Sequence, residues 1–200
     1  MQVTVWTDYI CPWAYGARPR TAWLVEQGVT LRYRAYELHP DLPPEGRPVR
    51  PGGRLDGVFD HIAAEGERQG QPFVKPTRSP NSRRALELLE LTQHHVPGAV
   101  VALDEALARA HWVEGRAIDD PAVLAAVASA AMGEEQPRTA LLERWRDGEG
   151  GTLVDASKAA AHEVGVTATP AWRIGGLTIT GLHPSEQFER WAGRLLRRDD

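Results

Sequence analysis

The segment VTVWTDYICPW, residues 3–13, joins an extended stretch to the only cysteine of the chain. Its first part alternates in a way typical of β-structure and predicts a strand over Val3–Trp6. A turn of sequence DYI follows. Pro12 then favours a helix start, because proline at the first helical position lacks an N–H that would have no partner there. The segment therefore predicts a strand, a short turn and a helix with Cys11 at its N-terminus.

Outward from this segment, the predicted helix extends to about Gln27, and Gly28 ends it. Pro19 lies inside the helix and should kink it, because proline removes a backbone hydrogen bond and clashes with the preceding turn. Residues 29–36 alternate again and predict a second strand, parallel to the first if the helix between them is a crossover. The N-terminal part of the chain is thus predicted to be a β-α-β unit.

The rest of the chain divides into a loop, a helical block and a second α/β segment. A loop rich in proline and glycine covers residues 39–54. Apolar residues at three- and four-residue spacing predict helices over residues 55–69, 81–96, 99–113, 121–132 and 138–147. The last part predicts a helix over 153–163, strands over 171–174 and 177–180, and a closing helix over 184–197.

The predicted element order is β-α-β, a block of helices, and α-β-β-α. This is the outline of an α/β thioredoxin fold interrupted by an all-α insertion. We expect a thioredoxin-like domain at residues 1–44 and 152–200 and a helical insertion domain at residues 45–151.

Composition and charge exclude several classes of function. With 42% hydrophobic and 25% charged residues the chain has the composition of a compact domain, or of two that pack closely. A net charge of −4 and a pI near 6.0 argue against nucleic acid and anionic membranes as partners. The sequence contains no segment typical of a signal peptide or a membrane span, so we expect a cytoplasmic protein.

A single cysteine excludes an internal disulfide and a thiolate cluster for a structural metal. We predict no metal site, since His94, His95 and His111 fall on predicted helices where histidines are usually surface residues. Cys11 must therefore react with an outside partner or be structural. From its helical position alone the two interpretations are about equally supported.

The N-terminus of a helix favours the thiolate form of a cysteine through unpaired N–H groups and the helix dipole. We expect the pKa of Cys11 to fall to roughly 3.5–7.5, the range of reactive cysteines at such positions. The thiolate is the form that attacks disulfides and electrophiles, which makes Cys11 a candidate nucleophile.

Several motifs together resemble the DsbA-type thioredoxin family, especially its cytoplasmic FrnE-like branch: DYICPWAYG at residues 8–16, YELHPDLPPEG at 36–46, Asn81-Ser82, WVEGRAID at 112–119 and GVTATP at 165–170. The resemblance spans the chain. It implies thiol–disulfide exchange at Cys11 and a cis bond before Pro170, with the backbone of Thr169 open to pair with an extended substrate. The implied substrate-binding residues are Pro12, Trp13, Ala14, His39, Asn81, Thr169 and Pro170.

The sequence departs from the family at Ala14, where the Cys-Pro-Trp-Cys motif has its second cysteine. A cysteine three residues further along the helix lies beside the first and can displace a partner from its mixed disulfide. Alanine cannot. We therefore expect a monothiol enzyme that acts on a disulfide-containing protein or a small thiol. Its mixed disulfide would be resolved by an external thiol of the glutathione or mycothiol type, with no tightly bound cofactor. The oligomeric state is left open.

Two other functions stay open. A related branch of the fold, resembling kappa-class glutathione transferases and 2-hydroxychromene-2-carboxylate isomerases, binds glutathione and also lacks the second cysteine, and Asn81-Ser82 resembles its Asn-Thr pair. A peptide-binding module without catalysis is the third possibility. His39 could tune Cys11 or act as an acid or base, although a simple loop histidine is favoured. Trp13, Trp112 and Trp172 could line an apolar groove, with core packing the simpler account for most tryptophans.

Overall fold

The computed structural model describes residues 1–133 and 135–197, with side chains described for 1–133 and 138–197. Its centre is a four-stranded sheet in the order β2-β1-β5-β6, made of β1 (Gln2–Thr7), β2 (Thr30–Ala35), β5 (Ala171–Ile174) and β6 (Leu177–Thr180). β1 is parallel to β2 and antiparallel to β5, and β5 is antiparallel to β6. The predicted thioredoxin-like sheet is confirmed.

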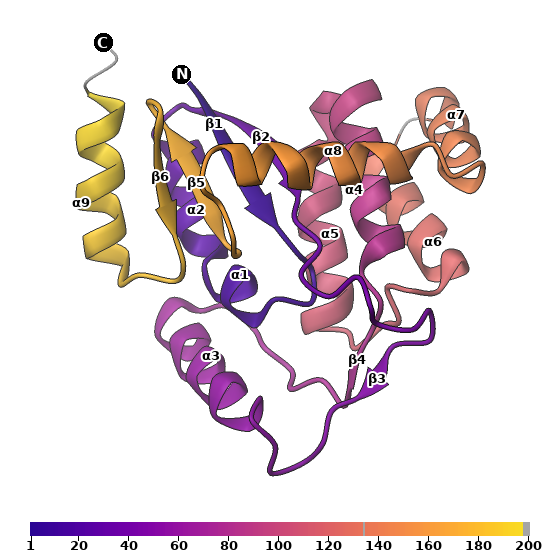
Figure 1. Ribbon diagram of the computed structural model, residues 1–200, viewed down its shortest axis with the longest axis horizontal. Coiled ribbons are helices and arrows are strands. Elements are labelled where there is room, and N and C mark those ends of the chain that lie inside the picture. The colour runs from indigo at the N-terminus through magenta and orange to yellow at the C-terminus, as the bar shows by residue number, and fades with distance from the viewer. Residues whose placement is uncertain (134, 198–200) are drawn as a thin grey trace.

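Helices cover both faces of this sheet (Figure 1). On one face lie α2 (Arg18–Glu26) and α9 (Ser185–Leu196), and Val3 and Val5 of β1 belong to the same buried cluster as Leu24 of α2. On the other face α8 (Gly150–Glu163) crosses β1 and β2, where Trp6 of β1 clusters with Ala161. The alternation of β1 side chains, read from the sequence, thus corresponds to two different apolar layers.

The helix predicted to extend from the cysteine to Gln27 is two helices, α1 (Pro12–Gly16) and α2, separated at Ala17. Pro19 lies in the first turn of α2, where its missing N–H removes no helical hydrogen bond. The predicted kink is therefore a complete break. Gly28 follows α2 with a φ of 79°, a conformation that glycine adopts without strain.

The helical block contains α3 (Asp56–Gln69), α4 (Arg83–His95), α5 (Val100–Trp112), α6 (Pro121–Met132) and α7 (Glu135–Arg146), with a short 3₁₀ turn at Pro97–Ala99. These helices match the predicted ones within a few residues. Two strands that the sequence did not predict, β3 (Arg47–Pro48) and β4 (Arg78–Ser79), pair antiparallel. A two-residue strand is too short to produce an alternating pattern.

The helical block and the sheet pack closely. α4 packs against both β2 and α8, and one buried apolar cluster includes residues of the sheet, α4, α5 and α6. The division into a thioredoxin-like domain and an insertion at residues 45–151 stays a prediction. Among the described residues, no helix combines the length and the hydropathy needed to span a bilayer.

Candidate active site

Cys11 is the N-cap residue of α1, as the sequence predicted. Its Sγ accepts a hydrogen bond from the backbone N–H of Ala14 at 3.4 Å, and its own N–H donates to the carbonyl of Asp8 at 3.0 Å. A cysteine at this position faces N–H groups that have no partner within the helix. The local sequence therefore places one sulfur atom at the beginning of a helix, directly after the strand β1.

The segment Thr169-Pro170 lies against this sulfur. The Cys11 thiol donates a hydrogen bond to the carbonyl oxygen of Thr169, with Sγ and O 3.3 Å apart. The antiparallel pairing of β1 with β5 explains the contact. Trp6 is opposite Ala171, so the residues that follow β1 and those that precede β5 lie at the same end of the two strands. The bond between Thr169 and Pro170 is cis, so both expectations for this segment, its proximity to Cys11 and its isomer, are confirmed.

The predicted low pKa of Cys11 is wrong in direction. Cys11 is only 3% exposed, and burial raises the pKa of its thiol. The side chain of Thr169 and the N–H of Ala14 lower that pKa only part of the way back. The sequence could not reveal this, because α1 is a single short helix and the surroundings of the sulfur come from distant segments.

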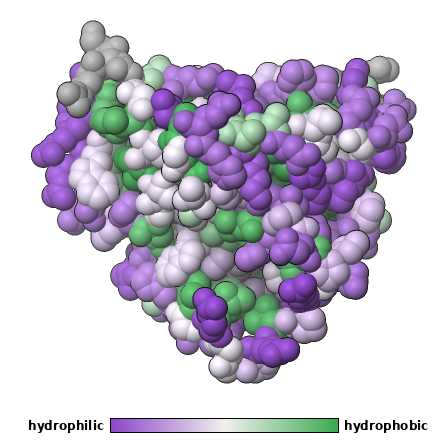
Figure 2. Space-filling view, viewed as in Figure 1, coloured by the Kyte–Doolittle hydropathy of each residue, from purple (hydrophilic) through white to green (hydrophobic). Residues whose placement is uncertain are grey.

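The residues after Cys11 divide between surface and interior. Trp13 is 36% exposed, and its ring packs against the ring of His61 on α3 with 5.4 Å between centroids. Pro12 is half-buried and Ala14 is buried. In the space-filling view hydrophobic residues gather near the centre of the face, where Figure 1 places α1, whereas hydrophilic residues dominate over α7 (Figure 2). A substrate-binding role for Pro12, Trp13 or Ala14 stays a prediction.

His39 and Asn81 each hydrogen-bond to Leu42, in the loop that follows β2. His39 is exposed on the loop after β2, and its carbonyl accepts the N–H of Leu42. Asn81 donates from Nδ2 to the carbonyl of Leu42 at 2.6 Å, and its Oδ1 accepts the N–H of Arg83 at 2.9 Å. Asn81 thus anchors the loop that carries His39 to the start of α4. A substrate-binding role for either residue stays a prediction.

Asp8 is a residue of the site that the sequence analysis did not single out. It is 1% exposed, and its carboxylate accepts the N–H of Ile10 at 3.2 Å and that of Leu38 at 2.8 Å. Burial raises the pKa of Asp8, and its charge contributes to the raised pKa of Cys11. The only signal in the sequence was an acidic residue directly after a buried strand. Asp8 holds the turn that positions Cys11.

Three other candidates belong to the interior. Trp112 and Trp172 are each 1% exposed, so they are core residues and do not line a groove. His111 is also buried, contrary to its predicted surface position, whereas His94 and His95 are exposed. His111 packs against Trp112, with 4.5 Å between the ring centroids, on the inner face of α5. Its burial depends on how α5 packs, which helical spacing alone did not reveal.

Comparison with known proteins places this arrangement in a family. A family model described as a DSBA-like thioredoxin domain matches residues 2–191. A search of curated proteins finds no match.

Solved structures resemble the chain over nearly its full length. A probable DsbA oxidoreductase from Streptomyces coelicolor is 21% identical with a TM-score of 0.83, covering 98% of this chain and 89% of its own. A 2-hydroxychromene-2-carboxylate isomerase is 25% identical with a TM-score of 0.76, covering 100% of this chain and 98% of its own. The cytosolic disulfide reductase DsbM from Pseudomonas aeruginosa, solved with GSH, is 20% identical with a TM-score of 0.72, covering 98% of this chain and 100% of its own.

Proposed function

The chain belongs to the DsbA-like thioredoxin-domain family, and on that premise we propose that it is a monothiol thiol–disulfide oxidoreductase acting through a mixed disulfide at Cys11. The observation that carries the proposal is the position of Sγ, which caps α1 and contacts the carbonyl of Thr169. In the chain there is no second thiol to resolve the intermediate, because Cys11 is the single cysteine and Ala14 occupies the position one turn further on.

The proposed reaction consists of two exchanges. The Cys11 thiolate attacks one sulfur of a substrate disulfide, the Cys11–substrate bond forms, and the other substrate sulfur leaves as a thiolate. An external thiolate then attacks the substrate sulfur of the mixed disulfide and releases Cys11 as a thiolate. The external thiol ends in a disulfide with that substrate sulfur, the other substrate sulfur is a free thiolate, and the enzyme returns unchanged. With a glutathionylated substrate attacked at its glutathione sulfur and reduced glutathione as the external thiol, the products are the substrate thiol and oxidised glutathione.

We propose glutathione, or a thiol of the same size class, as the resolving co-substrate, and the cytoplasm as the compartment. Support comes from the similar fold of a cytosolic disulfide reductase solved with GSH. The reducing cytoplasm also supplies low-molecular-weight thiol in excess, which a monothiol enzyme requires.

The hydrogen bonds of the site suggest how substrate binding and chemistry are linked. Formation of the mixed disulfide removes the S–H that occupies the Thr169 carbonyl. That oxygen then becomes free to accept an N–H from an extended substrate. Because the pKa of the Cys11 thiol is raised, the first exchange should accelerate as the pH rises above 7.

The experiment uses oxidised glutathione and intact-mass spectrometry. At pH 8 we expect one glutathionyl adduct per chain, which reduced glutathione removes. Turnover is then measured with a glutathionylated peptide and reduced glutathione. Cys11→Ser should form no adduct and lose turnover, whereas Trp13→Phe, which keeps an aromatic ring over His61, should retain the adduct.

The proposal fails if Cys11 stays unmodified at pH 8, or if Cys11→Ser retains turnover of the glutathionylated peptide. Since the chain has one cysteine, any adduct that forms has a single possible location.

A thiol-dependent transferase or isomerase is the second candidate, and one observation favours it. A buried Cys11 with a raised pKa can donate its S–H to the sulfur of a bound thiol cofactor without becoming a nucleophile. The likeness to a 2-hydroxychromene-2-carboxylate isomerase agrees with this mode. In that case Cys11→Ser should keep glutathione affinity and most of the activity, because serine can donate the same hydrogen bond.

A further inference from the structure

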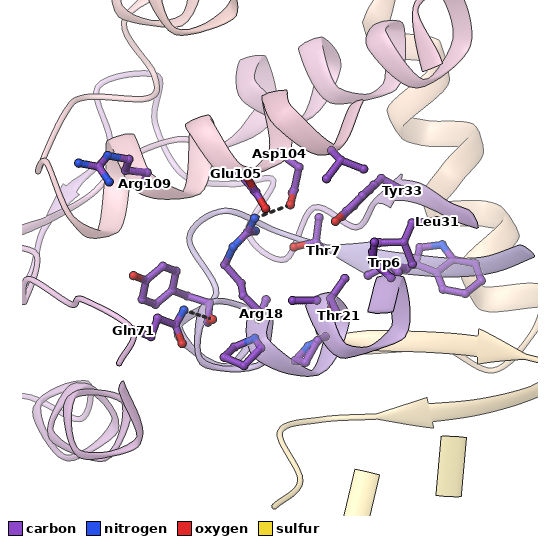
Figure 3. Close-up of a pocket in the computed structure, with 18 of the residues that line it drawn as sticks. Trp6, Thr7, Arg18, Thr21, Leu31, Tyr33, Gln71, Asp104, Glu105 and Arg109 are labelled. Atoms are coloured by element: carbon purple, nitrogen blue, oxygen red, sulfur yellow. Dashed lines mark hydrogen bonds and ion pairs between the residues drawn. The ribbon is translucent and has the colours of Figure 1, made fainter. Parts of the chain in front are cut away.

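A cavity lies between α2, the strands β1 and β2, and α5 (Figure 3). Its volume is about 510 Å³, within the range of small-molecule sites. Cys11 does not line it, although Ala14 and Pro170, which lie beside the sulfur, do. The cavity therefore borders the proposed thiol site without including its sulfur.

The walls of this cavity are largely apolar. Val5 and Leu31 belong to the sheet, while Ala22 and Val25 come from α2 and Val101 comes from α5. Val25 and Val101 are 44% and 38% exposed, on the two helices that face each other across the cavity. An apolar ligand that covers exposed apolar side chains on both sides of the opening removes them from water, which favours binding.

The charges within the cavity balance. The guanidinium of Arg18 lies 2.8 Å from Asp104 Oδ2, and the side chain of Asp104 is only 1% exposed. Glu105 and Arg109 add one charge of each sign to the lining. Burying a ligand charge here would leave it without a counter-ion, so the cavity favours a neutral ligand.

One buried acceptor atom supplies the specific feature of the cavity. Gln71 Oε1 is buried without a hydrogen bond from the described residues, while its Nε2 donates to the carbonyl of Tyr15 at 2.8 Å. Asp104 Oδ2, by contrast, has the guanidinium of Arg18 as its partner. A buried acceptor without a donor is destabilising, so a ligand donor that reaches Gln71 Oε1 stabilises the complex. Gln71 lines the cavity.

We propose that this cavity binds a neutral, mostly apolar small molecule with a hydroxyl group that donates to Gln71 Oε1. The apolar body covers the side chains from α2 and the sheet. The hydroxyl donates a hydrogen bond to an acceptor that has no donor among the described residues. A cavity filled only with ordered water is the competing explanation, and it predicts no ligand preference.

The experiment compares two probes of nearly equal shape, 4-propylphenol and 4-propylanisole, by isothermal titration calorimetry. Only the phenol has an O–H donor. We expect one phenol to bind per chain, at least about fivefold more tightly than the anisole. This is the ratio of dissociation constants that one net hydrogen bond produces. Gln71→Leu is titrated in parallel, and the preference for the phenol should shrink in it.

Ala22→Trp places a large ring on the exposed side of α2 at the cavity and should abolish binding. Ala102→Trp is the matched control, because Ala102 is exposed on α5 and does not line the cavity. Val101→Trp blocks the cavity from the opposite side if Ala22→Trp does not fold. The inference is overturned if neither probe binds, if both bind equally, or if binding survives both blocking variants. None of these measurements depends on thiol exchange.

Discussion

Cys11 is subject to opposing influences that act on a single sulfur atom. The N–H of Ala14 and the side chain of Thr169 favour the thiolate, while burial and the nearby charge of Asp8 favour the thiol. Burial is the largest of these effects. The thiol is therefore the favoured form of Cys11, and a higher pH should increase the reactivity of its sulfur.

The first prediction concerns Thr169. Its hydroxyl is buried without a hydrogen-bond partner among the described residues and lowers the pKa of Cys11, because it can donate to the thiolate, so Thr169→Val should raise that pKa further. We expect alkylation of Cys11 by iodoacetamide to slow severalfold at pH 7.5, and its pH profile to move upward. Thr167→Val, at an exposed position of the same loop, is the control and should react like the parent. An unchanged profile in Thr169→Val would exclude this role of Thr169.

The second prediction concerns Ala14. Its N–H contacts Sγ and its side chain is one helical turn beyond Cys11, so Ala14→Cys should restore a resolving thiol. Oxidation should close an internal disulfide and leave no free thiol in a titration under denaturing conditions. Ala22→Cys, on the exposed side of α2, should keep two free thiols at low protein concentration. Two free thiols in oxidised Ala14→Cys would contradict the placement of α1.

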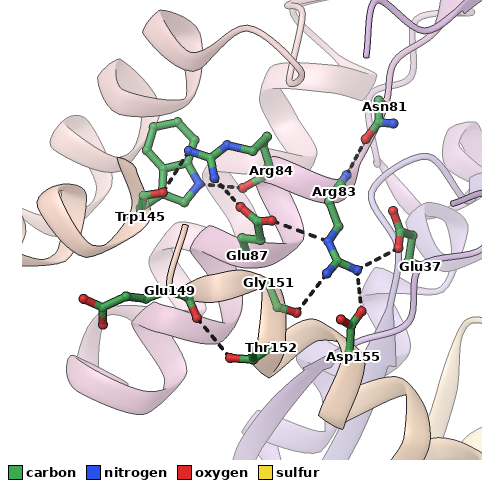
Figure 4. Close-up of polar contacts among 10 residues, drawn as sticks. All are labelled: Glu37, Asn81, Arg83, Arg84, Glu87, Trp145, Glu149, Gly151, Thr152 and Asp155. Atoms are coloured by element: carbon green, nitrogen blue, oxygen red, sulfur yellow. Dashed lines mark hydrogen bonds and ion pairs between the residues drawn. The ribbon is translucent and has the colours of Figure 1, made fainter. Parts of the chain in front are cut away.

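At the scale of the elements, Arg83 joins three segments that are distant in sequence (Figure 4). From the first turn of α4 its guanidinium contacts Glu37 after β2 at 3.0 Å and Asp155 of α8 at 2.7 Å. It also donates to the carbonyl of Gly151 at 2.9 Å. The side chain of Glu37 is 7% exposed, so this ion pair is shielded from water more than a surface pair.

The third prediction follows from this cluster. Arg83→Gln leaves the buried carboxylate of Glu37 without its cation and should lower the free energy of unfolding by about 2 kcal/mol. Urea denaturation measures the change. Arg144→Gln is the matched control, because Arg144 and Glu149 form an exposed pair, and it should cost no more than about 0.5 kcal/mol. Equal losses in both variants would mean that the Arg83 cluster contributes nothing beyond a surface ion pair.

At the scale of the whole molecule, the buried His111 makes stability depend on pH. Burial lowers the pKa of His111 to about 4, an effect that Asp119 opposes and Arg78 reinforces. The unfolded chain binds this proton near pH 6.5 and the folded protein does not, so stability falls as the pH decreases from 6.5 toward 4. Asp8 and Glu90 act in the opposite direction, because burial raises the pKa of each carboxyl.

The fourth prediction separates these groups. Between pH 7.5 and 5, His111 should account for a loss of about 2 kcal/mol of unfolding free energy. His111→Gln cannot titrate, so its stability should decline less over the same interval, whatever its absolute value. His94→Gln, at an exposed position, is the control and should follow the parent. Identical slopes for the parent and His111→Gln would show that folding does not change the pKa of His111.

Local patterns in the sequence determined the secondary structure and the position of the sulfur. Alternation predicted the four strands of the sheet, helical spacing predicted the helices, and Pro12 marked the start of α1 beside Cys11. The resemblance to a known family supplied the contact between Cys11 and Thr169-Pro170. The sequence alone also shows that the chain has no second cysteine, because this is a matter of composition.

Only the tertiary structure decided which groups are shielded from water. Segments that are distant in the sequence but close in space determine the raised pKa of Cys11, the burial of His111 and the contact between Trp13 and His61. The cavity between α2 and α5 has the same origin. A periodic pattern records which face of an element is apolar. It does not record which distant element covers that face, and this decides the dielectric surroundings of each group.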